Sequence, residues 1–193
     1  MPTRIFTTII LLFSALPVLA HDNAGIAGGF SSGFMHPILG WDHVAAMVAV
    51  GLWGAVLKHP AIWVLPVTFP LVMAFGGALG VAGIPLPGVE IGIATSALVL
   101  GIAVLFALRP PLWIATAAVG CFAIFHGHAH GTELPHAASP LAYSLGFVIS
   151  TGLLHLCGIV IGSLAHWRFG RVLVRAGGAV IAAAGAWFVV QAV

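Results

Sequence analysis

Histidines beside acidic residues are the part of this sequence best suited to chemistry. The chain has ten His, six Lys or Arg and four Asp or Glu, so His is as common as all the charged residues together. Imidazole and carboxylate groups are good ligands for divalent nickel, cobalt, zinc and copper, whereas monovalent copper prefers sulfur ligands. The two segments in which His and acids lie close together are therefore candidate metal-binding sites.

The first segment contains His36, Asp42 and His43. Pro37 suits the first turn of a helix, which places a membrane span at 37–57. His36 and His43 are seven residues apart, so on one helix they share a face but lie about 10 Å apart along its axis. They are too distant to share an ion unless His36 lies on a loop that folds back. A carboxylate within a span is costly unless it is paired, hydrated or bound to a cation. Asp42 is therefore predicted to be a ligand, with structural pairing to a neighbouring His as the alternative.

The second segment contains His126, His128, His130 and Glu133. Alternating His within five residues, followed by a carboxylate, supplies nitrogen and oxygen ligands at close range. If the preceding span continues as a helix, His126 and His130 lie on one face at i and i+4, a spacing that lets two imidazoles share a divalent ion. This segment is predicted to bind metal, and a solvated polar loop is the alternative.

Three further features have open interpretations. Glu90 begins a predicted span and is a candidate ligand, although an acid at a helix start can simply be favoured by the helix dipole. Pro66 and Pro70 interrupt another span and free backbone carbonyls, as in the broken helices of transport sites, or they produce a simple kink. His155 lies deep in a later span as either a relay ligand or a packing residue.

Composition indicates the elements that must position these residues. Of the 193 residues, 61% are apolar and 5% charged, whereas soluble domains carry roughly 25% charged residues. A soluble domain and a disordered chain are therefore excluded, and the net charge of +2 gives no indication of nucleic-acid binding. The prediction is an all-α membrane bundle, because apolar runs of this length cross a bilayer as helices, which satisfy their own backbone hydrogen bonds. A single domain of residues 21–193 has six spans, near 37–57, 61–82, 89–108, 111–127, 140–165 and 172–190.

Targeting and charge predict the orientation of the bundle. Residues 1–20 have the form of a cleaved signal peptide, with an uncleaved first helix as the alternative. The Lys and Arg residues of the mature chain lie only in loops after the first, third and fifth spans, which places those loops in the cytoplasm. Both mature termini are then periplasmic, in a bacterial inner membrane. The basic residues are Lys58, Arg109, Arg168, Arg171 and Arg175.

The two histidine segments together resemble the motifs of the HupE/UreJ family of nickel permeases. The matching residues are His36-x5-Asp42-His43, followed after the fourth span by Phe125-His126-Gly-x-Ala-His130-Gly-x-Glu133. The resemblance covers essentially the whole chain and implies supply of Ni²⁺ to NiFe hydrogenase or urease. Nickel is then the cargo rather than a cofactor, Co²⁺ or Zn²⁺ are possible competitors, and cytoplasmic maturation proteins are possible partners.

The absence of a nucleotide-binding motif favours a permease over an ATP-driven pump. The sequence has no nucleotide-binding motif, which leaves facilitated diffusion or coupling to an existing gradient. The alternative function is an intramembrane zinc-dependent hydrolase, because three His and an Asp can hold zinc with one position open to water.

Overall fold

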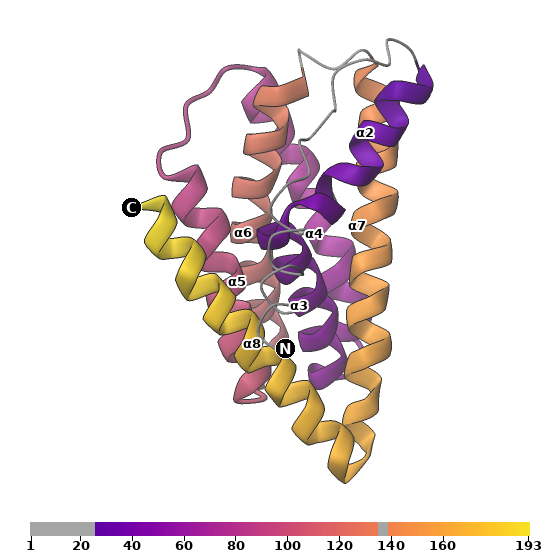
Figure 1. The fold of residues 1–193 in the computed structure, drawn as a ribbon, viewed down its shortest axis with the longest axis vertical. Helices are drawn as coiled ribbons and strands as arrows, with labels where there is room; N and C mark the ends of the chain where they lie inside the picture. The colour runs from indigo at the N-terminus through magenta and orange to yellow at the C-terminus, as the bar shows by residue number, and fades with distance from the viewer. Residues whose placement is uncertain (1–25, 135–138) are drawn as a thin grey trace, which may run out of the picture.

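All the regular secondary structure in the described part of the chain is helical. The computed structural model describes residues 26–134 and 139–193, and the predicted signal peptide at 1–20 lies outside them. These residues form seven α-helices and one 3₁₀ helix (Figure 1). Their bounds are α2 Ile26–Leu39, α3 Trp41–Leu57, α4 Ala61–Val81, α5 Val89–Leu105, α6 Leu112–Glu133, α7 Pro140–Ser163, η2 Leu164–His166 and α8 Arg168–Ala192.

Helix length and composition identify a multi-pass membrane protein. Four segments of the described chain are long and apolar enough to cross a bilayer: α4, α6, Pro140–His166 and α8. The bent pair α2 and α3 supplies a fifth if it is counted as one span. Helix α5 is apolar but has 17 residues, about 26 Å of rise against a hydrocarbon core of about 30 Å. The predicted total of six spans requires α5 to cross as well, and it stays a prediction.

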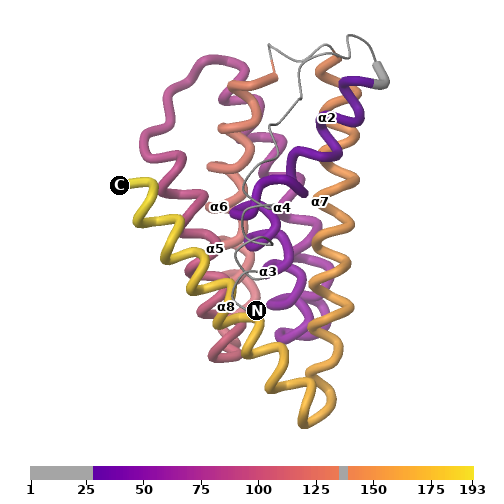
Figure 2. Tube along the Cα trace, in the orientation of Figure 1, coloured from indigo at the N-terminus to yellow at the C-terminus, as the bar shows by residue number. Residues whose placement is uncertain are grey.

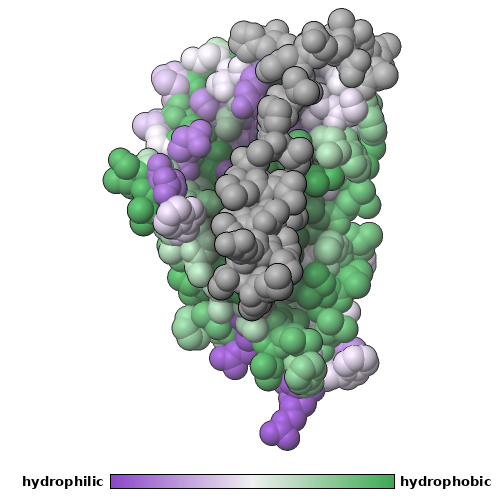
Figure 3. All heavy atoms as spheres, in the orientation of Figure 1, coloured by the Kyte–Doolittle hydropathy of each residue, from purple (hydrophilic) through white to green (hydrophobic). Residues whose placement is uncertain are grey.

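The outer surface agrees with a lipid environment. Large apolar side chains face outward, among them Trp113 at 71% and Leu141 at 74% exposure. Figure 3 shows apolar side chains over most of the visible flank, with hydrophilic ones near the upper left and at the lower tip. Exposed apolar surface on this scale requires lipid or another partner to cover it.

Two predicted spans differ from the helices observed. The span predicted at 37–57 is wrong at its start, because α2 continues through Pro37 to Leu39 and α3 begins at Trp41. The span predicted at 111–127 does continue into the histidine segment, as expected, and α6 ends at Glu133. The other boundaries agree with the observed helices within about four residues.

A sharp bend separates α2 from α3. The two helices meet at 78° (Figure 2). Gly40, between them, has extended backbone angles of φ −84° and ψ 105°. A Cβ at Gly40 would lie 3.0 Å from His43 Nδ1 and 3.1 Å from Asp42 Oδ1, so a residue without a side chain fits the bend best. This bend folds His36 back towards His43.

The helices pack in pairs, and glycines of the second histidine segment lie in the contact between α4 and α6. Helix α4 lies along α6 and α5 along α8, while α2 and α3 both pack against α7 (Figure 1). Gly127 and Gly131 of α6 face α4, where an added Cβ would overlap the carbonyls of Met73 and Gly77. Small residues allow this close approach of two helices within a membrane. The glycines of the segment therefore pack α6 against α4.

The ends of α3 and α5 and the first turns of α8 meet at one end of the bundle. Trp53 Nε1 donates to the Leu108 carbonyl at 3.0 Å, and Arg175 Nε donates to the Leu105 carbonyl at 2.7 Å. In Figure 1 the turn between α7 and α8 lies at the lower end, and the loop between α4 and α5 lies at the upper end. The basic residues therefore gather at the lower end, and placing that end in the cytoplasm stays a prediction.

Candidate metal centre

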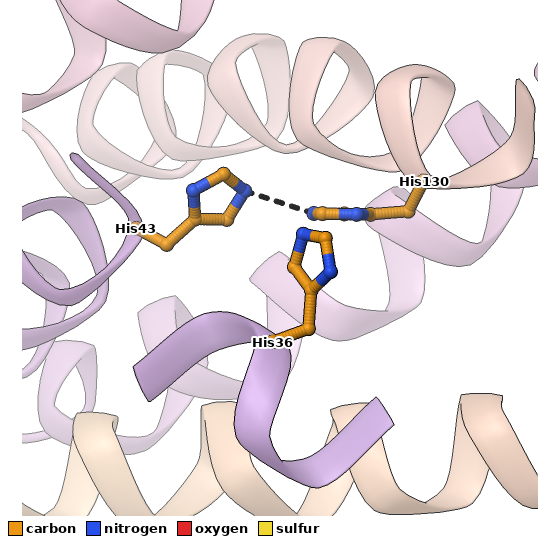
Figure 4. Close-up of side chains that lie close together, drawn as sticks. All are labelled: His36, His43 and His130. Carbon is orange, nitrogen blue, oxygen red and sulfur yellow. Dashed lines mark hydrogen bonds between the residues drawn. The ribbon is translucent and has the colours of Figure 1, made fainter. Parts of the chain in front are cut away.

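Three histidines from three helices converge inside the bundle. His36 of α2, His43 of α3 and His130 of α6 each offer a nitrogen, and these nitrogens all lie within 4.8 Å of one another (Figure 4). His43 and His130 are each 7% exposed, whereas the His36 side chain is 33% exposed. We call these three residues the triad. Its buried pair and its half-open third member suit an ion that enters from one side.

The spacing within the buried pair matches that of two ligands on one ion. His43 Nε2 lies 2.9 Å from His130 Nε2. Two imidazole nitrogens that bind one ion at about 2.1 Å, at right angles, lie about 3 Å apart. Without an ion, one nitrogen donates its hydrogen to the lone pair of the other. The His36 nitrogen can be up to 4.8 Å away, so a small inward shift of its half-exposed ring would complete the set.

Asp42 acts on this centre through His43. The Nδ1–H of His43 donates to Asp42 Oδ1 at 2.8 Å, and the backbone N–H of His43 donates to the same oxygen at 2.9 Å. With its proton on Nδ1, His43 presents the Nε2 lone pair to the centre. A carboxylate behind a ligating His fixes its tautomer and raises its basicity. Asp42 is therefore paired with a neighbouring His, which was the alternative to its being a ligand. This pairing favours metal binding by His43, because it directs the Nε2 lone pair towards the centre.

Glu133 provides the second negative charge. Its Oε2 lies 3.7 Å from His130 Nδ1 and 3.9 Å from His36 Nε2, and its side chain is 56% exposed. These distances exceed those of a hydrogen bond, but an exposed Glu side chain can rotate to bind an ion or to accept the Nδ1–H of His130. Two carboxylates flanking three neutral imidazoles match the charge of a divalent cation.

Aromatic side chains of α7 form one wall of the centre. The Phe147 ring centroid lies 4.3 Å from that of His130 and 6.1 Å from that of His36. The Tyr143 ring lies 6.1 Å from His36. These two residues are not among the ligands predicted from the sequence. Their i, i+4 spacing shows that they share a face of α7, but no pattern in the sequence indicates that this face contacts the triad.

His126 adjoins the triad without belonging to it. It is fully buried, and its ring centroid lies 5.1 Å from that of His43. Its Nδ1–H donates to the Phe122 carbonyl at 2.9 Å. Its Nε2 has no hydrogen-bond partner among the described residues, so a lone pair is available there.

His128 and Glu90 lie outside the triad. His128 donates from Nε2 to the Ile84 carbonyl at 2.7 Å, which ties α6 to the loop between α4 and α5. On a helix it points about 160° away from both His126 and His130. Glu90 is exposed in the first turn of α5. The geometry therefore brings together five of the eight predicted ligands, places His126 beside them, and leaves these two apart.

Comparison with known proteins identifies relatives over nearly the whole chain. Residues 9–188 match the family described as HupE / UreJ protein. The protein named Protein HupE of Rhizobium leguminosarum bv. viciae is 44% identical over 185 residues, covering 95% of this chain and 96% of that protein. No solved structure matches the chain.

Proposed function

Because the chain belongs to the HupE / UreJ family, we propose that it carries Ni²⁺ across the bacterial inner membrane, from the periplasm to the cytoplasm. The imported ion would serve the maturation of NiFe hydrogenase or urease. Convergence of the triad with Asp42 and Glu133 is the observation that carries this function. A signal peptide, six spans and periplasmic mature termini are part of the same proposal.

The exposure of the ligands suggests how an ion enters. His36 and Glu133 are the partly open members, with side-chain exposures of 33% and 56%. They would take Ni²⁺ from the aqueous side and deliver it to the buried His43 and His130. A transport site must replace the ion's hydration yet release the ion again. A site with two partly exposed and two buried ligands would meet both demands.

The choice of nickel comes from the family rather than from the ligand set. Imidazole and carboxylate ligands bind copper more tightly than nickel, by the Irving–Williams order, and they also bind cobalt and zinc. Co²⁺ and Zn²⁺ are therefore expected to compete with Ni²⁺. The driving force would be facilitated diffusion or an existing gradient.

A zinc-dependent hydrolase is not favoured. Such an enzyme needs a carboxylate base beside an open position on its zinc. Asp42, the half-buried candidate for that base, instead accepts two hydrogen bonds from His43. The HupE / UreJ relationship extends over nearly all of this chain.

Uptake of radioactive nickel tests the function. The chain is expressed in bacterial cells that lack other nickel importers, and the His43→Ala variant, at matched membrane levels, serves as the control. The wild type is expected to restore uptake, with Co²⁺ and Zn²⁺ competing, and the variant is expected to fail. A well-inserted wild-type chain that gives no uptake above empty cells would overturn the proposal.

A further inference from the structure

His155 is a buried imidazole that the triad does not use. It lies in the middle of α7 and is 2% exposed. Neither ring nitrogen has a hydrogen-bond partner among the described residues. A buried polar group without a partner is unfavourable, and an apolar side chain of similar size would fill the same space at lower cost. An unpaired imidazole at this position therefore needs another explanation.

The face of α7 that carries His155 begins at the triad. Tyr143, Phe147, Thr151 and His155 follow one another at intervals of four residues, so they line one face of the helix. Tyr143 and Phe147 contact the rings of the triad. His155 lies eight residues beyond Phe147, about 12 Å along the axis, on the side of the basic end. The hydroxyls of Tyr143 and Thr151 are also buried without partners in the described chain.

Helix α4 provides an oxygen opposite His155. The Pro66 carbonyl faces the imidazole ring without forming a hydrogen bond of normal geometry. Within α4 this carbonyl would normally accept from the residue four positions later, but that residue is Pro70, which has no N–H. A carbonyl freed in this way within a span is tolerated where it lines a cavity or finds another partner.

Phe69 separates His155 from the histidines above it. Its ring centroid lies 5.4 Å from that of His126 and 5.4 Å from that of His155. His126 in turn contacts His43 of the triad and has a free Nε2. The rings therefore follow in the order His43, His126, Phe69 and His155. The three histidines of this series can bind a metal ion, whereas Phe69, which lies between His126 and His155, cannot.

We propose that His155 is the principal ligand of a second, inner Ni²⁺ site, which also uses the Pro66 carbonyl and the Thr151 hydroxyl. This inner site rests on the proposed transport function and adds a step to it. An ion leaves the triad by way of His126 and reaches His155 when the Phe69 ring turns aside. One imidazole and two neutral oxygens make a weaker site than the triad, which suits release towards the basic end.

The His155→Leu variant separates a ligand from a packing residue. Leu fills a similar volume and removes the unpaired nitrogens, so a packing role predicts normal uptake and unchanged or higher thermal stability. A ligand role predicts that uptake falls by roughly tenfold or more. Ni²⁺ binding to the triad, measured by equilibrium dialysis of the purified full chain in detergent, should remain. Normal uptake by His155→Leu, with normal uptake by the wild type, would overturn the inner site and leave the transport function standing.

A second variant reports directly whether the ion visits residue 155. His155→Cys is made in a chain whose Cys121 and Cys157 are replaced by Ser, and the matched control is Leu156→Cys in the same background. Leu156 is the next residue on α7 and is 49% exposed. Thiolate is a strong ligand for soft and borderline metals, and a thiolate bound to Ni²⁺ gives a charge-transfer absorption. We expect this absorption on adding Ni²⁺ to His155→Cys alone. Its absence there, or equal absorption in the control, would contradict the inner site.

Discussion

Asp42 Oδ1 lies 2.8 Å from His43 Nδ1, and this contact determines which nitrogen of His43 faces His130. The carboxylate accepts the Nδ1–H, so the lone pair of His43 is on Nε2, 2.9 Å from the Nε2 of His130. A residue on the outer side of the centre thus sets the ligand geometry within it. The same relation explains why an acid is retained in an otherwise apolar helix.

Asp42→Asn is expected to abolish most nickel uptake. The amide keeps the size of the carboxylate, but it removes the negative charge and accepts the Nδ1–H of His43 more weakly. Loss of such a partner typically lowers metal affinity by about 10–100-fold. Asp42→Glu keeps the charge and is expected to retain more activity than Asn. Uptake is measured at equal membrane levels, and normal uptake by a well-expressed Asn variant would exclude a role for this carboxylate in transport.

Gly40→Ala is expected to weaken nickel binding without removing any ligand. The added methyl would lie 3.0 Å from His43 Nδ1 and 3.1 Å from Asp42 Oδ1, so the pair must shift by a few tenths of an ångström. We expect a several-fold loss of Ni²⁺ affinity in equilibrium dialysis. Gly152→Ala on α7 is the control, because its methyl would meet no atom of the described residues within 4 Å. Equal affinities in the two variants would show that the bend tolerates a side chain.

Much of the fold was predictable because its signals are local. Apolar composition identified a helical membrane protein, and Pro, Gly and charged residues placed most helix ends. The break at Gly40 was missed because Pro37 is equally compatible with a helix start, and the apolar pattern continues across the break. Whether α2 and α3 form one straight helix depends on their packing against α7, a tertiary contact without a local signal.

The candidate site was only partly predictable for the same reason. His36 and His43 share an ion only if the chain folds back between them, a condition that depends on the 78° bend. His128, in contrast, is predicted as a ligand with its neighbours, although helical geometry alone places it about 160° from His126 and His130. The contacts of His155 with Phe69 and Pro66 join α7 to α4, and no spacing in the sequence relates those two helices.

Gly131→Ala is expected to destabilise the fold rather than the metal centre. Its methyl would overlap the Gly77 carbonyl, so α4 and α6 would have to move apart. Overpacking of this kind typically costs about 1–3 kcal/mol. A lower unfolding temperature in detergent and a lower membrane level are the expected results. Gly177→Ala on α8, where the methyl would meet no described atom within 4 Å, serves as the control and should be neutral.

His128 and His130 are two residues apart, yet their substitution is expected to give opposite results. His130→Gln removes a buried nitrogen 2.9 Å from His43 Nε2, so Ni²⁺ affinity should fall by more than about tenfold and uptake should be lost. His128→Ala removes the hydrogen bond to the Ile84 carbonyl. It should lower stability by about 1 kcal/mol while leaving Ni²⁺ affinity unchanged. In His128→Gln the side-chain amide can still donate to that carbonyl, so both stability and uptake should approach the wild type. Affinity by equilibrium dialysis and unfolding temperature are measured on all three purified variants. If His128→Gln binds Ni²⁺ as poorly as His130→Gln, then α6 presents a different face to the ion from the one described.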